Sequence, residues 1–338
     1  MRSPLHDDLR AKGADFVEEA GALVARSFGD PANEYLALRR GVGLSDLSHM
    51  GMVSVSGPER LSFLESLLSQ ELSPLEEAGV MVPSLLLEPR GKVQFGVMAF
   101  SRPDDIVLVT ETGQGEALST ALNRWRIRVK CEVAPVPGLG LLEARGPGAA
   151  PMPGVGWDWP GLPGRLSLVD GGEVAARWRS LAGRVTPVGS AAREAVRIEA
   201  GVPRIGPGLD ADETTIPQEA FLERDMVSFT KGCFVGQELV CRIDTRGHVN
   251  RYLRGLVVGD SVLPPRGADV EHEGKSVGRV TGVAESLDLR APVALAYVRR
   301  NVDLPAPVTI KWDGGSAAAE ARELPLIGGP HVSAARPS

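Results

Sequence analysis

The sequence predicts a mixed α+β fold whose C-terminal part is all β. Near the start, the stretch VGLSDLSHMGMVSVSGPERLSFLESLLSQ combines an alternating strand pattern with an amphipathic helix. From Tyr252 onward, short β-prone runs alternate with turns that contain Gly and Pro. The chain has 338 residues, which is more than one core usually spans, so we expect two or three packed domains.

The first predicted unit is a strand, a turn and a helix. Apolar and polar residues alternate from Met52 to Val55, and Gly57 with Pro58 marks a turn before a helix with inward-facing leucines. A weaker form of this pattern follows later, where an apolar stretch runs into Gly146 and Pro147. The repetition indicates two related halves in the N-terminal part.

The middle of the chain alternates predicted strands and helices. The stretches SLLLEPRGKVQFGVMAF and DDIVLVTE are predicted strands around a turn at Pro89–Gly91, and GEALSTALNRWRI is a predicted helix. Residues 138–164 hold eight glycines and five prolines and are interpreted as a connection. Beyond them, LSLV and AARW predict strands. The stretch SAAREAVRIEAG predicts a helix with Ser190 as N-cap and Gly201 as its stop.

The last region has a different character. The runs LRGLVVG, KSVGRVTGV, VALAYV and PVTIKW follow one another at intervals typical of a small antiparallel barrel or sandwich. The sequence therefore predicts a third, all-β domain.

Composition limits the classes of function. Apolar residues make up 43% and charged residues 24% of the chain, as in an ordinary soluble globular protein. The net charge of −6 provides no global attraction for nucleic acid, so any anion site must come from a local group of Lys or Arg. No apolar segment has the length of a signal-peptide core or a membrane span. We expect a cytoplasmic protein that binds neither a membrane nor nucleic acid directly.

Three cysteines are present, at Cys131, Cys233 and Cys241. Their odd number and wide spacing argue against a disulfide framework. Neither Cys233 nor Cys241 has a His or a second Cys at zinc-ligand spacing, so the sequence predicts no metal site.

The stretch TKGCFVGQELVCRIDTRG is the densest in chemically capable residues. Thr230 is a plausible N-cap, and CFVGQELVCRI has the length of about three helical turns, with Cys233 in the first turn. The positive end of the helix and the neighbouring Lys231 would favour the reactive thiolate. A buried cysteine that serves only packing is the alternative, and it is the interpretation we favour for Cys131 and Cys241.

Glu199 is a second candidate. It stands near the C-terminal end of its predicted helix, where exposed carbonyls disfavour a carboxylate by about 0.3–1 kcal/mol. Either the carboxylate binds a ligand, or it is a surface group paired with Arg193 or Arg197.

The segment TKGCFVGQELVCR resembles the signature of the YgfZ-like folate-binding proteins. The spacing agrees throughout, and the matching residues are Lys231, Gly232, Cys233, Phe234, Gly236, Gln237, Glu238 and Arg242. Further similarity covers VGLSDLSHMGMVSVSGPERLSFLESLLSQEL, RIEAGVPRIGPGLDADETTIPQEA, GKSVGRVTGV and ALAYVRR. The similarity is weakest across residues 151–188.

The same blocks are similar to the aminomethyltransferase (T-protein) of the glycine cleavage system. The resemblance implies three domains around a central tetrahydrofolate pocket, the last of them an antiparallel β-barrel. The implied folate-binding domain joins residues 1–52 and 136–245, and a second α+β domain covers 53–135. The barrel covers 246–328, and a flexible tail is expected at 329–338.

The resemblance also shows one difference. In the aminomethyltransferase, an Asp-Asp pair after a Gly-Gly turn supplies the carboxylate that meets the reactive folate nitrogen. Phe95 and Gly96 stand at this position here. Without a proton acceptor at that nitrogen, we expect no classical aminomethyltransferase activity.

The binding half of the implied site is retained. Glu199 matches the glutamate that holds the pterin ring, and Met50 matches a position that packs against the folate. Gln237 and Arg242 are implied as further folate contacts, and Cys233 as the functional thiol beside Lys231. One group of arginines is open to three interpretations: it receives the glutamate tail of folate, it binds a partner's phosphates, or it is a solvated basic face. This group is Arg242, Arg246, Arg251 and Arg254.

YgfZ-like proteins are implicated in the assembly or maintenance of iron–sulfur clusters, including those of radical enzymes that modify tRNA. The resemblance therefore implies a folate-dependent accessory factor, whose partners are iron–sulfur proteins or assembly factors on which Cys233 acts. The chain lacks a full set of cluster ligands, so stable cluster binding would need a partner or a dimer. The alternatives are a folate-dependent one-carbon (aminomethyl-type) transferase with an altered catalytic group, and a folate-binding module without chemistry.

Overall fold

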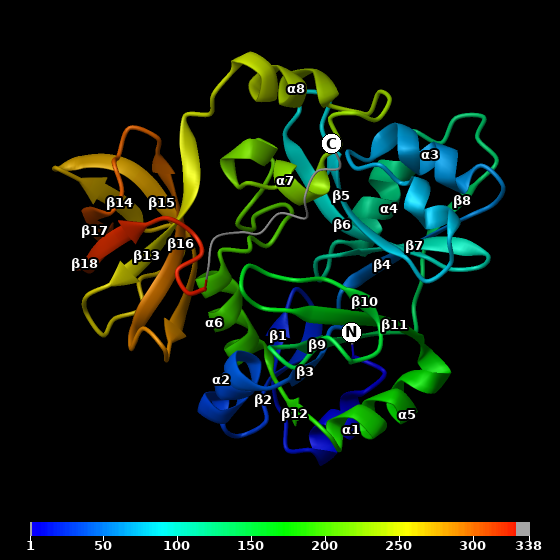
Figure 1. Cartoon of the computed structure of the whole chain (residues 1–338), viewed down its shortest axis with the longest axis horizontal. Coiled ribbons are helices and arrows are strands. Elements are labelled where there is room, and N and C mark those ends of the chain that lie inside the picture. The colour runs from blue at the N-terminus through cyan, green and yellow to red at the C-terminus, as the bar shows by residue number, and fades with distance from the viewer. Residues whose placement is uncertain (1, 329–338) are drawn as a thin grey trace.

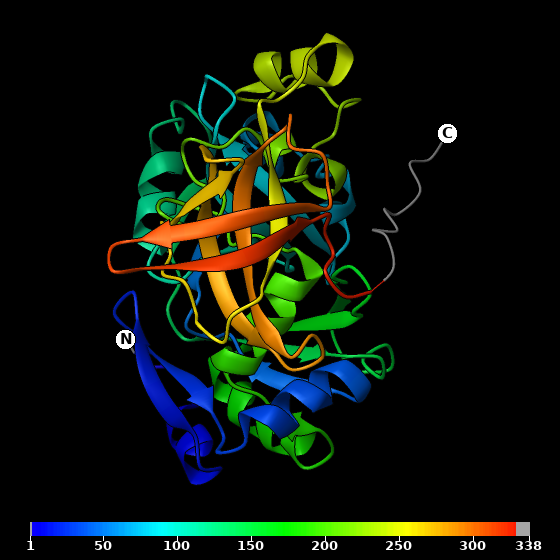
Figure 2. The same ribbon diagram turned by 90° about the vertical axis from the view of Figure 1, so that its left-hand side faces the viewer.

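The computed structural model describes residues 2–328, and the predicted tail at 329–338 lies outside this described part. Two five-stranded sheets and a closed six-stranded barrel are its main β units. In Figure 1 the barrel lies at the left, the first sheet at the upper right and the second sheet below it. Figure 2, turned by 90°, looks onto the barrel. The predicted α+β fold with a C-terminal antiparallel barrel is confirmed.

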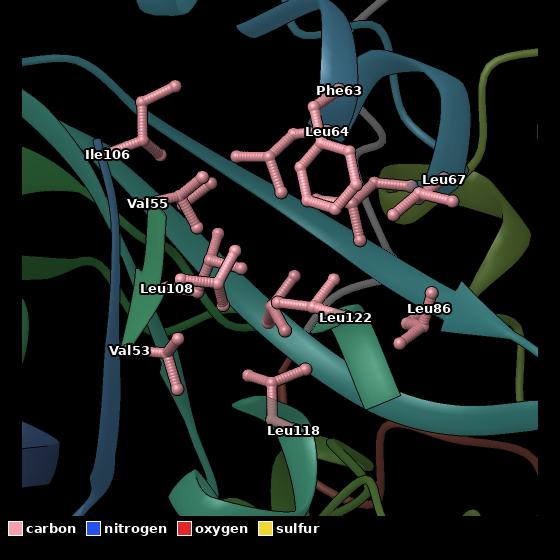
Figure 3. Packing of buried hydrophobic residues seen from close by; sticks show 14 of the residues in the cluster. Val53, Val55, Phe63, Leu64, Leu67, Leu86, Ile106, Leu108, Leu118 and Leu122 are labelled. Atoms are coloured by element: carbon pink, nitrogen blue, oxygen red, sulfur yellow. The ribbon is translucent and has the colours of Figure 1, made fainter. Parts of the chain in front are cut away.

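The first sheet is antiparallel, with strand order β5-β6-β7-β4-β8. Helices α3 and α4 and the short 3-10 helix η1 pack on it, and their apolar side chains meet those of Val53, Val55 and Leu108 (Figure 3). The predicted strand–turn–helix unit is therefore confirmed. The elements are β4 (Gly51–Ser56), α3 (Arg60–Leu67), η1 (Ser73–Glu76), β5 (Met81–Leu87), β6 (Val93–Ser101), β7 (Asp105–Thr110), α4 (Gly115–Asn123) and β8 (Glu132–Pro135).

The second sheet has strand order β10-β11-β9-β3-β12. Its core joins Leu44 and Leu142 of the sheet to Val174 and Trp178 of helix α5. Its strands are β3 (Gly43–Asp46), β9 (Leu139–Arg145), β10 (Val155–Gly156), β11 (Gly164–Asp170) and β12 (Thr186–Pro187). The same part of the chain holds α1 (His6–Ala11), the hairpin β1 (Asp15–Glu19) and β2 (Ala22–Ser27), α2 (Pro31–Arg40), α5 (Gly171–Ala182) and α6 (Ser190–Ala200).

The barrel closes in the order β13-β16-β15-β14-β17-β18 around a core of small aliphatic side chains. Three short helices precede it and connect it to the sheets. These helices are η2 (Pro217–Glu219), α7 (Glu223–Met226) and α8 (Gln237–Arg246). The strands are β13 (Arg251–Val258), β14 (Asp269–His272), β15 (Lys275–Ser286), β16 (Ala291–Arg299), β17 (Ala306–Trp312) and β18 (Gly315–Arg322).

Three local predictions are wrong. AARW belongs to helix α5, because Val174, Trp178 and Leu181 recur at helical spacing and are buried on one face. Residues 138–164, which were predicted to be a connection, contain strands β9 and β10, and both strands pair with β11 in the second sheet. Ser190 is the first residue of α6 and not its N-cap, which is the extended residue before it. The predicted stop at Gly201 is confirmed, since it adopts the left-handed conformation with φ 74°.

Each sheet takes almost all its residues from one predicted domain. The exception is β4, which begins two residues before the predicted boundary at residue 53. The domain boundaries themselves stay a prediction. Between residues 2 and 328, no helix combines the length and the apolar character needed to cross a membrane.

Candidate functional site

A cavity of about 1020 Å³ lies between the two sheets and the start of the barrel. Strands β6 and β7 contribute one wall, and helix α6 contributes another. Small-molecule sites typically occupy about 300–1,000 Å³, so the cavity has the size of a site for a bulky ligand. Thioether and aromatic side chains line much of it, namely Met50, Met98, Trp157, Trp159, Phe221 and Tyr252.

One face of α6 brings charge to this cavity. Arg193, Glu194 and Arg197 all line it, together with Ser190. Arg197 donates to both carboxylate oxygens of Glu194, at 2.8 and 2.6 Å. Burial raises the pKa of Glu194, but the charge and hydrogen bonds of Arg197 outweigh it, and the pKa is about 2. Glu194 is therefore an ionised carboxylate at neutral pH. These three residues were missed from the sequence, although their spacing of three and four positions is typical of one helix face.

Trp159 forms a flat wall that two arginines hold in place. The guanidinium of Arg145 lies 3.7 Å from the ring centroid, and that of Arg193 lies 5.0 Å from it. Both arginines bind Glu143, at 2.9 and 2.6 Å. Burial raises the pKa of Glu143, but the two positive charges lower it to about 2. The Trp159 indole is thus fixed by stacked cations that a buried carboxylate anchors.

Met50 lines the cavity, as its predicted role requires, but its contact with folate stays a prediction. The preceding residue, His49, also lines the cavity and was missed from the sequence. Burial lowers the pKa of His49, and the charges of Arg193 and Arg204 lower it further, to about 4. His49 therefore presents a neutral imidazole to the cavity at pH 7.

The first half of β6 shows what replaces the Asp-Asp pair. Gly96 lines the cavity, whereas Phe95 is buried in the core of the first sheet. A Cβ added to Gly96 would come within 2.7 Å of Ile205, so this side chain occupies the place of a longer residue. The wall has no carboxylate at this position.

A carboxylate directly follows the neighbouring strand, β7. The hydroxyl of Thr110 donates to the Gly96 carbonyl at 2.9 Å, and Glu111 follows directly at the end of β7. Glu111 lines the cavity, and Arg204 holds it with two contacts of 3.0 Å. Glu111 was also missed, because the sequence does not reveal which strand end lies beside Gly96.

Glu199 does not have the environment of a surface carboxylate. Its carboxylate is fully buried, accepts a bond of 2.7 Å from the Tyr35 hydroxyl and forms an ion pair with Arg39. The surface position and the pairing with Arg193 or Arg197 are therefore wrong. Glu199 is not among the described residues that line the cavity, so its contact with the pterin stays a prediction.

The segment Thr230–Gly247 differs from its predicted form. Helix α8 begins only at Gln237, so Cys233 lies in the preceding loop and not in a first helical turn. The predicted three-turn helix that starts at Cys233 is therefore wrong.

Gly236 is the reason for the late start of α8. It is the N-cap and adopts a left-handed conformation with φ 81°, which interrupts any helix that runs through it. A Cβ at this position would also lie 2.5 Å from the carbonyl oxygen of Glu88. The glycine lets the loop approach the turn between β5 and β6 closely.

The three thiols differ in exposure. Cys233 is exposed, whereas Cys131 is buried in the core of the first sheet and Cys241 is half-buried. Burial raises the pKa of the Cys131 thiol. Burial and then the charge of Asp244 raise the pKa of the Cys241 thiol. The assignment of the functional thiol to Cys233 stays a prediction.

Lys231 is buried and fully engaged. Its ammonium donates to the carbonyl oxygens of Glu65, Leu68 and Gln70 at 2.8, 2.9 and 2.9 Å, and it contacts the Glu65 carboxylate at 2.8 Å. These acceptors lie at the C-terminal end of α3, where a cation is favoured. Lys231 thus anchors the loop before α8 to the first sheet's helix.

The other signature residues lie around this loop. Phe234 is buried in an apolar cluster that also contains barrel residues. The exposed residues Glu238 and Arg242 form an ion pair of 2.5 Å one helical turn apart. Neither Gln237 nor Arg242 is among the described residues that line the cavity, so their contacts with folate stay predictions.

The four arginines considered together in the sequence are separated. Arg242 and Arg246 belong to α8, whereas Arg251 and Arg254 belong to β13. Of these four, Arg254 alone lines the cavity, where it pairs with Glu323. An odd separation on a strand puts Arg251 on the opposite face from Arg254. In residues 2–328, no group of three or more His, Cys, Asp or Glu side chains is arranged to hold a metal ion.

Comparison with protein families gives two matches. Residues 5–152 match the GCVT N-terminal domain, and residues 251–327 match the glycine cleavage T-protein C-terminal barrel domain. The second match covers the barrel described above.

Individual proteins are similar over nearly the full length. The chain is 30% identical to the aminomethyltransferase of Rubrobacter xylanophilus over 327 residues, which covers 88% of this chain and 87% of that protein. It is 28% identical to the aminomethyltransferase of Thermotoga neapolitana, covering 97% and 98% of the two chains. The crystal structure of glycine cleavage system aminomethyltransferase T from Bartonella henselae superposes with a TM-score of 0.83 at 26% identity, covering 97% and 98% of the two chains.

Proposed function

Because the chain belongs to the aminomethyltransferase (glycine cleavage T-protein) family, we propose that its cavity binds tetrahydrofolate or a derivative for one-carbon transfer. The ionised carboxylate of Glu194, which lines the same cavity as several aromatic and thioether side chains, carries the proposal. An ionised carboxylate accepts paired N–H bonds from an aminopyrimidine edge, and a flat ring packs well on aromatic and thioether side chains. Tetrahydrofolate would supply the nitrogen that carries the one-carbon unit.

The residues of the chain fit such a ligand in distinct roles. Arg197 keeps Glu194 ionised and oriented, while Met50 and Trp159 offer apolar and aromatic surface. The neutral His49 can exchange hydrogen bonds without adding charge. The cavity can therefore contact both the polar edge and the flat ring faces of a pterin.

We further propose that Glu111 is the altered catalytic group. Gly96 cannot accept a proton, and Glu111 is the carboxylate at the end of the neighbouring strand. The Nε–H of Arg204 donates a hydrogen bond to the Glu111 carboxylate and holds it in place. A positioned carboxylate of this kind typically contributes about 10²–10⁴-fold to the rate of a proton transfer.

Calorimetry with tetrahydrofolate tests the binding half. Glu194→Gln keeps the shape of the side chain and removes its charge, so we expect affinity to fall about tenfold or more, since hydrogen bonds to charged groups contribute about 1.5–3 kcal/mol. The control Glu238→Gln removes an exposed carboxylate and should bind like the parent. If Glu199→Gln weakens binding and Glu194→Gln does not, the pterin belongs to Glu199. If the parent protein does not bind tetrahydrofolate, the proposal fails.

A transfer assay tests the catalytic half. Glu111→Gln should lower the rate of folate-dependent aminomethyl transfer at least 100-fold and leave tetrahydrofolate affinity within about twofold of the parent. If the parent binds tetrahydrofolate without any transfer, Glu111 has no catalytic role, and the protein is a binding module or an accessory factor.

One observation favours a second function, in iron–sulfur cluster assembly or maintenance. Cys233 is the exposed thiol, and it lies on a loop that Lys231 fixes outside the cavity. A thiol so placed can reach a cluster protein or an assembly factor, including a tRNA-modifying radical enzyme, while folate stays in the cavity.

Genetic complementation tests this second function. In a strain that lacks the gene, Cys233→Ser should fold normally and fail to restore iron–sulfur enzyme activity. Cys131→Ala and Cys241→Ala serve as controls and should restore it, because both thiols are at least half-buried. Full restoration by Cys233→Ser would remove the thiol from this function.

A further inference from the structure

We propose that a second, more open cleft is a binding site for a small ligand that carries phosphate. The cleft has a volume of about 730 Å³ and lies where the barrel meets the turn between β5 and β6. Arg251 lines it, whereas Tyr252 and Arg254 of the same strand line the first cavity. Because side chains alternate along a strand, β13 separates the two sites.

Four cations converge on this cleft, namely Lys92, Arg251, Arg299 and Arg300. Arg299 and Arg300 are exposed at the end of β16, and neither side chain has an ion pair or hydrogen bond within the described chain. Within residues 2–328, the one hydrogen bond of the Lys92 ammonium goes to the Thr214 carbonyl oxygen, at 3.4 Å. Three of the four cations therefore have no carboxylate partner among residues 2–328.

The first cavity provides a contrast. There Arg193, Arg197 and Arg204 each bind a protein carboxylate at 2.6–3.0 Å. Their charges are compensated inside the protein, and the ligand need not be strongly anionic. Free cations around a concave surface instead attract an anion from solution, even on a chain whose net charge is −6.

Glu219 is the carboxylate that lines the second cleft, and its charge is already compensated. Arg251 binds its two oxygens at 3.1 Å each, and the backbone N–H of Ile216 donates to one of them at 3.1 Å. The guanidinium of Arg251 also lies 4.4 Å from the Tyr297 ring centroid, so its orientation is fixed. The net positive charge of the cleft therefore comes from Lys92, Arg299 and Arg300.

The chemistry of these groups favours phosphate over carboxylate. A phosphate monoester concentrates about −1.5 to −2 charges and three acceptor oxygens in one group, so it can meet several convergent cations at once. Guanidinium groups bind it with two parallel N–H bonds. The volume is in the range of about 300–1,000 Å³ typical of small-molecule sites, which favours a phosphorylated metabolite over an extended polymer.

Calorimetry with inorganic pyrophosphate tests the proposal. We expect the parent protein to bind it, and Arg299→Gln and Arg300→Gln each to lower the affinity at least tenfold. Both residues are exposed, and equal melting temperatures would show that the variants fold. Arg177→Gln is the matched control, since it removes an exposed arginine from α5, and it should bind pyrophosphate within twofold of the parent.

Two further measurements separate the alternatives. A triglutamate peptide should bind at least tenfold more weakly than pyrophosphate, and Glu194→Gln should leave pyrophosphate binding unchanged because it acts in the other cavity. The proposal is overturned if pyrophosphate does not bind at millimolar concentration, if Arg177→Gln weakens binding as much as the cleft variants do, or if triglutamate binds equally well.

Discussion

The cavity face of α6 and the signature segment Thr230–Gly247 are both rich in charged residues, but they use charge differently. On α6, Glu194 is paired and still reaches the cavity. In the signature segment, the Lys231 ammonium donates hydrogen bonds to three carbonyl oxygens at the end of α3. Cys233 is the exposed one of the three thiols. The difference teaches that a charged residue in a distinctive motif can be a structural anchor, whereas a candidate for ligand binding must reach the cavity.

The largest expected effect tests Lys231 as an anchor. Lys231→Met keeps the length of the side chain but leaves the Glu65 carboxylate and three carbonyl oxygens without their donor. Breaking a buried pair typically costs about 3–5 kcal/mol, and we expect a loss near 3 because Glu65 is partly exposed. Urea denaturation measures it. The exposed Lys275→Met should change stability by less than about 0.5 kcal/mol. A comparable loss in both variants would contradict the anchoring role.

The sequence predicted best what depends on local pattern. Strand alternation and helical spacing were sufficient for the first sheet, α6 and the barrel, because burial of one face repeats every two residues in a strand and every three or four in a helix. The stretch AARW was misassigned because four residues cannot separate the two periods. Its helix is recognised only over the longer span from Val174 to Leu181.

Long-range pairing was not predictable in this way. Glu199 finds Arg39 across 160 positions, and Lys231 finds Leu68 across 163. No spacing rule connects such residues, so the sequence could name Glu199 as unusual without naming its partner. The late start of α8 was missed for a related reason. Gly236 combines a left-handed conformation with close contact to the turn between β5 and β6, and that contact is distant in the sequence.

The second prediction concerns His49, which lines the cavity. Burial and then Arg193 and Arg204 lower its pKa from 6.5 to about 4, so the folded state disfavours the proton that the unfolded chain accepts. The stabilisation is complete above pH 6.5 and is lost as pH falls toward 4. The parent should therefore lose about 2 kcal/mol relative to His49→Gln by pH 5. Urea unfolding across this range measures the difference.

A matched control is available for this pH dependence. His248 is exposed on the segment after α8, so His248→Gln should follow the parent at every pH. If His49→Gln also follows the parent between pH 6.5 and 4, the imidazole is not held neutral by the cavity.

An expected effect of similar size, at Glu223 in helix α7, has the opposite pH dependence. Burial raises the pKa of Glu223 from 4.5 to about 6 despite the charge of Arg224, and the carboxylates of Asp244 and Asp225 add to the rise. The folded state therefore binds a proton more tightly, and its stability is greatest below pH 4.5 and falls as pH rises through 6. Glu223→Gln mimics the protonated form, so it should match the parent below pH 4.5 and exceed it by up to about 2 kcal/mol above pH 6. The exposed Glu213→Gln should show no such gain. If Glu223→Gln is no more stable than the parent at pH 7.5, burial does not raise the pKa of this carboxyl group.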